Sequence, residues 1–386
     1  MIRFIHELED WPCLHWDQEK MTPILSTVRL RQGRLLGRME VLGFDLREEA
    51  VLQTLTQDVV ESSSIEGELL DKEQVRSSLA RRLGMDIGVL VLADRTVEGT
   101  VEMMLNATQL YAEPLTEERL FGWQAALFPT GRSGLTRLRI GAWRDDANGP
   151  MEVVSGPIGK ERVHFEAPAA VRLPSEMAAF LAWFNSQAPL LDPVLKAGLA
   201  HLWFVTIHPF DDGNGRIARA IADLALARSE GTAQRFYSLS AQIRRERKAY
   251  YDVLEGTQRG GLDVSDWLTW FLSCLDRALI GAEETLGTVL GKARFWEKHG
   301  SASLNERQRL MLNRLLDGFA GKLTTSKWAT IAKCSQDTAY RDIQDLMERC
   351  ILQRDATGGR STSYSLGVAE NQPTSNLNRL VDTRKG

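Results

Sequence analysis

The sequence has no long hydrophobic run. Its most apolar stretch, Ile87 to Ala93, is bounded by Asp86 and Asp94 and is far shorter than the ~20 apolar residues that cross a bilayer. The amino terminus, MIRFIHELEDWP, reaches acidic residues before any apolar segment develops, unlike a secretory signal. These absences predict a cytoplasmic protein that does not interact with a membrane.

Cysteine is also scarce. The chain has four widely separated cysteines, with no CxxC pair and no histidine at metal-ligand spacing: Cys13, Cys274, Cys334 and Cys350. We expect reduced, mostly buried thiols rather than a zinc site or a disulfide framework.

Neither sign of charge is in large excess. The 47 Lys and Arg residues face 51 Asp and Glu residues, so no global basic field marks nucleic acid as the main partner. The distribution is uneven, since residues 301–386 hold 13 basic and 9 acidic side chains. A length of 386 residues, with 43% hydrophobic and 25% charged residues, favours two or three globular domains.

The amino-terminal region is predicted to be helical with one polar interruption. Leu52, Leu55 and Val59 recur at the spacing of an amphipathic helix. The stretch that follows, ESSSIEGELLDKEQV (residues 61–75), is rich in residues that suit caps and turns better than helix interiors. One helix should end within it and another begin; on this pattern alone it is an interhelix turn.

A change of character follows the helical pattern of residues 97–126. Residues 131–159 contain many glycines and prolines, and the alternation in Glu152–Val154 and Arg162–Phe165 suggests a hairpin with Ser155-Gly156-Pro157 near its turn. An exposed hairpin edge can pair with an extended peptide. A plain connecting loop is the alternative.

The most distinctive stretch, HPFDDGNGRIAR from His208 to Arg219, lies among helical patterns. Helices are expected over residues 174–186, 193–207, 216–229, 265–279 and 281–300. The stretch is therefore predicted to be a tight glycine loop between two helices.

The carboxy-terminal part resembles a winged helix-turn-helix domain over about residues 304–366. Helices are expected near Ser326–Ala332 and Ser335–Arg349, the second with Ala339, Ile343 and Leu346 as its buried stripe. A hairpin of residues 351–354 and 361–366 would flank Thr357-Gly358-Gly359-Arg360, and a loose tail would follow Gly367.

The glycine loop has the composition of an anion-binding site. Gly213 and Gly215, around Asn214 at a helix start, would leave backbone N–H groups to converge on an anion. Arg216 and Arg219 are three residues apart, so both can face that anion. The loop is not a P-loop, because no Gly-Lys is followed by Ser or Thr in the chain.

Residues beside the loop add acid-base and metal chemistry. His208 can accept a proton near neutral pH, and Asp211 and Asp212 offer oxygen ligands for a hard cation. Singly, His208 and Phe210 are explained equally well as core residues, and Asp-Asp-Gly-Asn-Gly as a capped turn. Together the residues predict phosphoryl or nucleotidyl transfer to a nucleophile supplied by the substrate.

These residues resemble the signature of the Fic (filamentation induced by cAMP) family, His-x-Phe-x-Asp/Glu-Gly-Asn-Gly/Lys-Arg-x-x-Arg. Every fixed position is matched between His208 and Arg219. The resemblance implies a mainly α fold: a helical core with a small β-hairpin flap, plus the carboxy-terminal winged helix-turn-helix. It also implies an enzyme that binds ATP with Mg2+ and transfers AMP to a protein hydroxyl.

The resemblance also implies roles for residues by position. His208 would deprotonate the target Ser, Thr or Tyr hydroxyl, Phe210 would anchor the loop, and Asp212 would hold Mg2+. The phosphates would be bound by Gly213, Asn214, Gly215, Arg216 and Arg219, the last at the γ-phosphate. The hairpin would be the family flap, with Val154, Ser155, Gly156 and Val163 holding the target backbone as an added strand. Tyr250 and Tyr251 lie where members often contact the nucleotide, although aromatic core packing explains them too.

The serine-rich stretch fits a second family pattern, the inhibitory Ser/Thr-x-x-x-Glu-Gly/Asn, through Ser62, Glu66 and Gly67. Ser64 and Glu68 have the same spacing, but Leu69 follows them, so Glu66 is the better candidate. A glutamate paired with Arg219 would occupy the arginine that should hold the γ-phosphate. The resemblance therefore implies a self-inhibited protein adenylyltransferase (AMPylase).

Two alternatives stay open at this stage. A de-AMPylase could use the same site, with Glu66 orienting a water. A DNA-binding regulator could use residues 335–349, with Gln336, Thr338 and Arg341 facing a major groove and Arg360 in the wing, although the acidic residues of that helix favour a protein partner.

The expected domains are an amino-terminal helical region (1–96), a Fic domain with a linker helix (97–300), a winged helix (301–367) and a tail (368–386). The partner should be a protein substrate that the sequence does not name, and a homodimer is left open.

Overall fold

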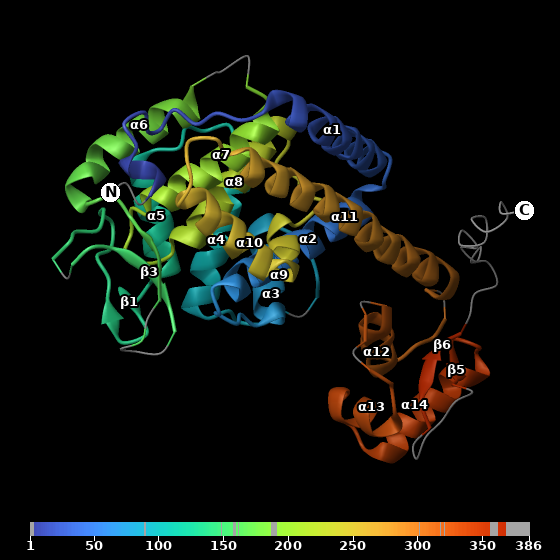
Figure 1. The fold of residues 1–386 in the computed structure, drawn as a ribbon. Coiled ribbons are helices and arrows are strands. Elements are labelled where there is room, and N and C mark those ends of the chain that lie inside the picture. Colours follow the sequence, from blue (N-terminus) through green and yellow to red (C-terminus); the bar gives the residue numbers. More distant parts are fainter. Residues whose placement is uncertain are drawn as a thin grey trace, which may run out of the picture. The chain divides into compact units, whose positions relative to one another are not determined.

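The computed structural model describes residues 4–88, 90–147, 149–156, 160, 162–186, 191–300, 302–316, 318–319, 321–355 and 362–367. Across them the chain is mainly helical with small two-stranded antiparallel hairpins (Figure 1), as the sequence predicts. It divides into two compact units, residues 1–286 and 287–386, with the division inside helix α11 (Ser265–His299). Among the described helices, none is long and apolar enough to cross a membrane.

The first unit is a helical bundle. Its helices are η1 (Ile5–Glu7), α1 (Gln18–Glu40), α2 (Phe44–Ile65), α3 (Lys72–Leu83), α4 (Arg95–Gln109), α5 (Glu117–Leu127), η2 (Ala170–Arg172), α6 (Leu173–Asn185), α7 (Pro193–Ile207), α8 (Asn214–Glu230), α9 (Leu239–Arg245), α10 (Arg247–Gln258) and the start of α11 (Ser265–His299).

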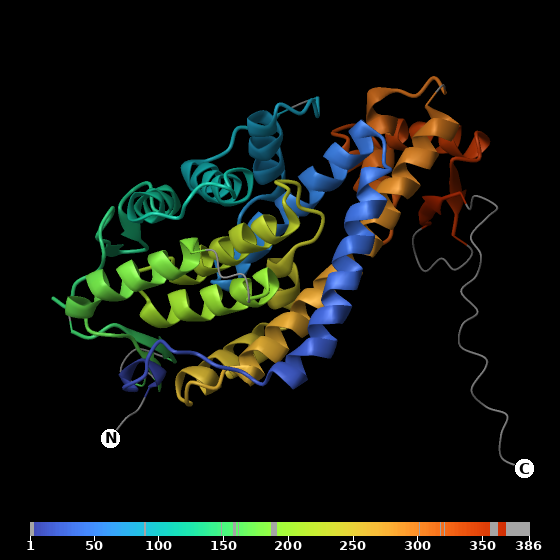
Figure 2. The same ribbon diagram turned by 90° about the horizontal axis from the view of Figure 1, so that it is seen from above.

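Helices α7 and α8 form the centre of this unit. They pack against each other and lie side by side in yellow-green, with α3 to α5 on one side and α1 and α11 on the other (Figure 2). Asp192 caps α7, and Pro193 occupies its first turn. Side chains from Val194 to Ile207 are buried nearly without exception, which explains why this run is apolar on every side.

Helix α1 runs along α11 and is fixed to it by ion pairs. Lys20 contacts Asp266, and Arg31 lies 2.7 Å from Asp276. Helix α2 packs separately, against α3 and α9.

The serine-rich stretch separates two helices, as predicted. Helix α2 ends at Ile65, Gly67 follows with a φ of 86°, and Asp71 caps α3. The helical pattern of residues 97–126 is not continuous, because the turn containing Pro114 separates α4 from α5.

The predicted hairpin is present within the same unit. Strands β3 (Glu152–Ser155) and β4 (Arg162–Glu166) pair antiparallel, while Pro157 and Gly159 lie outside the described residues. A further hairpin of β1 (Arg132–Ser133) and β2 (Thr136–Arg137) was not expected, because two-residue strands carry no readable alternation.

The second unit contains the end of α11, α12 (Glu306–Leu316), α13 (Thr325–Ile331), α14 (Gln336–Glu348), β5 (Leu352–Arg354) and β6 (Tyr364–Leu366). The predicted stripe of α14 is confirmed, since Ala339, Ile343 and Leu346 are fully buried. The predicted turn with Arg360, the strand start at Ser361 and the tail after Gly367 lie outside the described residues.

The four cysteines are free thiols, as predicted. Cys274 is buried, but Cys13 and Cys350 are exposed, so the expectation of mostly buried thiols is wrong. Cys13 and Cys350 lie at the surface, outside the hydrophobic core in which a cysteine thiol is usually buried.

Candidate active site

The loop between α7 and α8 begins with a residue in an unusual backbone conformation. His208 has φ 52° and ψ 57°, in the left-handed region, and its N–H donates to Phe204 O at 3.0 Å. Residues other than glycine adopt this region at a cost of about 1 to 2 kcal/mol. The backbone strain therefore lies at His208, the residue that the sequence predicts to be the catalytic base.

The side chain of Asn214 closes the loop on itself. Its Oδ1 accepts from Phe210 N at 3.0 Å, and its Nδ2 donates to Phe210 O at 2.7 Å. Phe210 is fully buried, with its ring centroid 5.2 Å from that of Trp143. The side chain of Asn214 therefore holds the loop in shape, while its backbone N–H lies at the start of α8.

Arg144 lies outside the loop and supports it, and no motif in the sequence predicts this role. It is buried, its Nε donates to His208 O at 2.8 Å, and its backbone N–H donates to Pro209 O at 2.9 Å. Asp146 lies 2.8 Å from its guanidinium. Because 64 residues separate Arg144 from His208, no local pattern could reveal the contact.

The tautomer of His208 follows from its neighbours. Nδ1 lies 3.1 Å from Val205 O, and a carbonyl can only accept, so Nδ1 carries the proton and Nε2 keeps its lone pair. Burial lowers the pKa of His208 to about 4. The hydrogen bond to the Val205 carbonyl raises this pKa, and the charge of nearby Arg144 lowers it. His208 is therefore neutral and able to accept a proton at physiological pH.

The two aspartates of the loop differ in their contacts. Asp211 Oδ2 accepts from Arg139 N at 2.8 Å, which ties the loop to the segment after β2. Asp212 Oδ1 accepts from Gly213 N at 2.6 Å. Nowhere in the described part of the chain do three or more His, Cys, Asp or Glu side chains gather as a metal site, so Asp212 could hold Mg2+ only together with phosphate oxygens.

Arg219 is fixed to the end of α2. It is 1% exposed; its Nε and Nη2 donate to Ser62 Oγ and Ser62 O at 2.9 and 2.8 Å, and its Nη1 donates to Glu66 Oε1 at 2.8 Å. We call this set of bonds the Arg219 contact. It joins the serine, glutamate and arginine that the family resemblance pairs.

Glu66 also covers the backbone of the glycine loop. A Cβ added at Gly215 would lie 2.2 Å from Glu66 Oε1, and Tyr251 Oη donates to Glu66 Oε2 at 3.3 Å. Burial alone raises the pKa of Glu66, but the charge and hydrogen bond of Arg219 bring it below its ordinary value. An ionised carboxylate thus lies where the loop and Arg219 could hold another anion, so the residues present fit a phosphate.

Glu68 has a partner of its own. Its carboxylate accepts from Arg216 Nη1, and the Arg216 guanidinium lies 5.0 Å from the centroid of the Phe128 ring. The sequence weighs Glu68 only as a weaker candidate for the inhibitory role. The structure pairs it with Arg216 and leaves Arg219 to Glu66.

Four of these residues line one cavity of about 540 Å³. Glu66, His208, Gly215 and Tyr251 share it with Val154 and Ser155 of the flap, which is the hairpin of β3 and β4. The size suits a nucleotide-sized ligand.

Tyr250 and Tyr251 have different surroundings. Tyr250 also borders the cavity but is 1% exposed, with its hydroxyl 2.9 Å from His201 Nε2 and its ring against Trp270. The core-packing interpretation therefore fits Tyr250, whereas Tyr251 reaches the cavity and Glu66.

A second, open groove of about 1080 Å³ lies against the flap. Val154 and Val163 line it together with Arg137, Arg139 and Asp211. Val154 lines both this groove and the cavity that holds His208, and it is 47% exposed. Gly156 ends the described part of β3's turn, with a φ of 108°.

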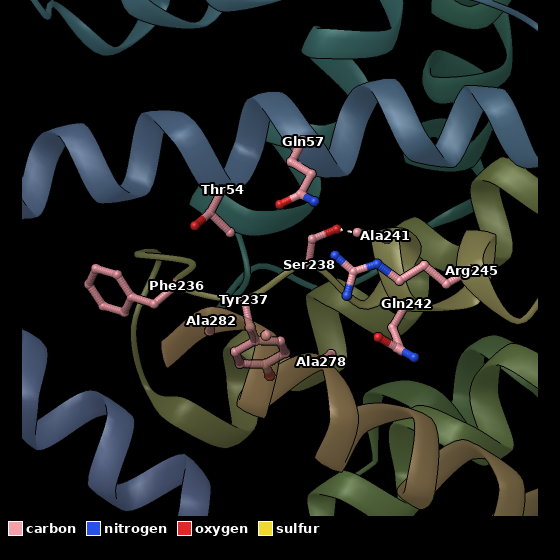
Figure 3. A pocket seen from close by; sticks show the side chains of 11 residues that line it. Thr54, Gln57, Phe236, Tyr237, Ser238, Ala241, Gln242, Arg245, Ala278 and Ala282 are labelled. Atoms are coloured by element: carbon pink, nitrogen blue, oxygen red, sulfur yellow. Dashed lines mark hydrogen bonds between the residues drawn. The ribbon is translucent and has the colours of Figure 1, made fainter. Parts of the chain in front are cut away.

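A small pocket lies between α2, α9 and α11 (Figure 3). Gln57 of α2 faces Arg245 of α9 across it, with Ser238 beside them. Its lining shares no residue with the cavity that holds His208. It therefore marks the packing of α2 on the bundle rather than a part of the catalytic cavity.

Comparison with known proteins matches two parts of the chain. Residues 114–226 match the Fic/DOC family, and residues 4–85 match a Domain of unknown function (DUF4172). The second match contains the whole of the serine-rich stretch of residues 61–75, and the first contains the glycine loop.

Curated relatives align over a limited region. The chain is 36% identical over 104 residues to a protein adenylyltransferase Fic of Aedes aegypti, covering 27% of this chain and 19% of that protein. It is 33% identical over 113 residues to one of Nematostella vectensis, covering 29% of this chain and 25% of that protein. The chain thus spans a quarter or less of the length of these relatives.

A solved structure shows the same fold over most of the chain. A Fic family protein from Desulfovibrio desulfuricans superposes with a TM-score of 0.50 at 22% identity, covering 91% of this chain and 97% of that one.

Proposed function

Because the chain belongs to the Fic/DOC family, we propose that it is a self-inhibited protein adenylyltransferase. It would transfer AMP from ATP to a Ser, Thr or Tyr hydroxyl of another protein. The observation that carries the proposal is the placement of Glu66, an anion bonded to Arg219 above Gly215, in the cavity of the neutral His208.

The reaction follows from the groups around the loop. Nε2 of His208 accepts the proton of the target hydroxyl, whose oxygen forms a bond to the α-phosphorus of ATP while the bond from that phosphorus to the bridging oxygen breaks and pyrophosphate leaves. The backbone N–H groups of residues 213–215 and the guanidinium groups of Arg216 and Arg219 bind phosphate oxygens. Mg2+ held by Asp212 would neutralise phosphate charge during this step.

Inhibition follows from the same contacts. While Glu66 and Ser62 hold Arg219, its guanidinium is not available to the γ-phosphate, and the Glu66 carboxylate repels phosphate charge. ATP would then bind without the alignment that the target hydroxyl needs. Release of Glu66 is therefore the step that activates the enzyme.

The test is incubation of labelled ATP and a cell lysate with wild type, Glu66→Gly and His208→Ala. We expect label on proteins with Glu66→Gly, little with wild type and none with His208→Ala. Label on lysate proteins that is equal in wild type and Glu66→Gly would contradict inhibition, and label on lysate proteins that persists without His208 would contradict the base.

De-AMPylation is the second candidate. Glu66 is ionised and lines the same cavity as His208, so it could orient a water towards an AMP-protein bond. Purified protein incubated with an AMPylated target distinguishes the two activities. Loss of label that depends on Glu66 would favour removal over transfer.

A further inference from the structure

Three side chains of the flap region form a hydrogen-bonded chain that the loop motif does not include. Ser155 Oγ lies 2.6 Å from His164 Nε2, and His164 Nδ1 lies 2.6 Å from Glu255 Oε2. A carboxylate accepts from Nδ1–H, so with that proton on Nδ1 the lone pair of Nε2 accepts a hydrogen bond from the Ser155 hydroxyl. This is the serine, histidine and carboxylate order of a nucleophilic triad.

The local backbone aims His164 at Ser155. Val153 pairs with Phe165 and Val154 pairs with Val163, so His164 has no partner on β3. It is the extra residue of a β-bulge, a feature that turns a side chain away from the regular alternation. The bulge brings the imidazole of β4 to the hydroxyl at the end of β3.

Glu255 holds the histidine from a helix. It lies on α10, and its carboxylate also contacts Arg162 at 2.8 Å and Arg259 at 3.2 Å. Arg259 in turn donates to Val163 O at 2.9 Å. The carboxylate is therefore fixed on a rigid element while it orients His164.

The chain of three opens into the cavity of the proposed reaction. Ser155, His164 and Glu255 line it together with His208, Glu66 and Gly215. A simple fastening of the flap would need only the ion pairs of Glu255. It would not need a serine hydroxyl within hydrogen-bond reach of the imidazole.

We propose that Ser155 is a nucleophile activated by His164, with Glu255 as the positioning residue, and that it accepts AMP within its own chain. This second part rests on the proposed function. Ser155 Oγ forms the bond to the α-phosphorus of ATP, the bond from that phosphorus to the bridging oxygen breaks, pyrophosphate leaves, and the serine proton passes to His164 Nε2. AMP on Ser155 would place a bulky anion on the flap, at the cavity that holds His208.

Activation of Ser155 can be tested without any nucleotide. A fluorophosphonate probe should modify Ser155 in wild type and Glu66→Gly, and general-base catalysis predicts a rate at least ~100-fold lower in His164→Gln. Arg162→Ala is the matched control, because it removes an ion pair of Glu255 but keeps the three-residue chain; its rate should match wild type. Equal probe rates with and without His164, in proteins with the same melting temperature, would overturn the proposal.

Acceptance of AMP is then read by mass spectrometry of the Ser155 peptide after incubation with ATP. Glu66→Gly should carry AMP on Ser155, and so should Glu66→Gly/His208→Ala, since His164 rather than His208 serves this hydroxyl. Glu66→Gly/His164→Gln should lose it while still modifying lysate proteins.

The outcomes separate the two proposals. Labelled lysate proteins without AMP on Ser155 would overturn the self-modification and leave the proposed function intact. Modification of Ser155 that needs His208 but not His164 would overturn the role of His164. No AMP transfer to any protein, with Ser155 still reactive to the fluorophosphonate, would overturn the proposed function and acceptance of AMP but support the activated serine.

Discussion

Removal of the Glu66 carboxylate should activate the enzyme by an amount that the structure allows to be estimated. Glu66→Ala deletes one of the three hydrogen bonds of Arg219 and the negative charge above Gly215. The two bonds of Arg219 to Ser62 remain. The variant therefore frees Arg219 only in part, but it empties the position where phosphate would bind.

The magnitude depends on the burial of the pair. Arg219 is 1% exposed and the Glu66 side chain is 32% exposed. A hydrogen bond to a charged group contributes about 1.5 to 3 kcal/mol, and breaking a fully buried ion pair costs about 3 to 5 kcal/mol. Because solvent reaches a third of Glu66, we take about 2 kcal/mol, which corresponds to about a thirty-fold increase in productive ATP binding.

The assay is the initial rate of labelled AMP incorporation at a fixed ATP concentration below saturation. Glu61→Ala is the control, since it removes a negative charge five residues before Glu66 without removing a bonding atom of the Arg219 contact. Glu61→Ala should match wild type. An unchanged rate for Glu66→Ala, in a protein that binds ATP and remains folded, would refute inhibition by Glu66.

Three further predictions concern other parts of the molecule. Ser62→Ala removes the bond from Arg219 Nε and should raise the same rate about five-fold, the equivalent of about 1 kcal/mol; a rate below wild type would mean that Ser62 positions Arg219 for catalysis instead. Because burial lowers the pKa of His208 to about 4, its lone pair is lost only as pH falls through that value, so kcat/KM of Glu66→Gly should stay level from about pH 8 to pH 5; a decline centred near about pH 6.5 would contradict the buried neutral base. Asp342 of α14 is buried against Arg307 and Asn305, while Arg341 is exposed. We expect α14 to bind a protein partner, so random duplex DNA should show no salt-dependent mobility shift. A shift that weakens in Arg341→Ala would instead assign this helix to DNA binding.

Much of the central loop could be predicted because its information is local. The run from His208 to Arg219 is continuous, and turn residues, helix starts and charge spacing are all readable within it. The serine-rich stretch was readable for the same reason, since caps and turns are short-range features. Pairing Glu66 with Arg219 needed the family resemblance, because 153 residues separate them.

The contacts that escaped prediction join distant segments. Arg144 supports His208, Glu68 pairs with Arg216, and Glu255 orients His164. Each residue is an ordinary charged side chain in its own segment. Only the packing of α2, α8, α10 and the flap brings the partners together, and that packing depends on the tertiary fold rather than on local propensity.

The break between α4 and α5 was also hard to predict. Apolar residues continue on both sides of Pro114, and the period alone does not show where the chain turns. The β-bulge at His164 is a similar case, because an extra residue in a strand pattern looks like a minor irregularity until the register is known.

The closeness of Glu66 to Gly215 also constrains how related sequences can vary. A Cβ at residue 215 would lie 2.2 Å from the Glu66 carboxylate, so any side chain there would displace the glutamate. The family pattern admits Gly or Lys at this position. Relatives that keep the glutamate of α2 should therefore keep glycine, whereas lineages that acquire lysine should have lost or moved the glutamate, and the two positions should covary through evolution although they are far apart in sequence.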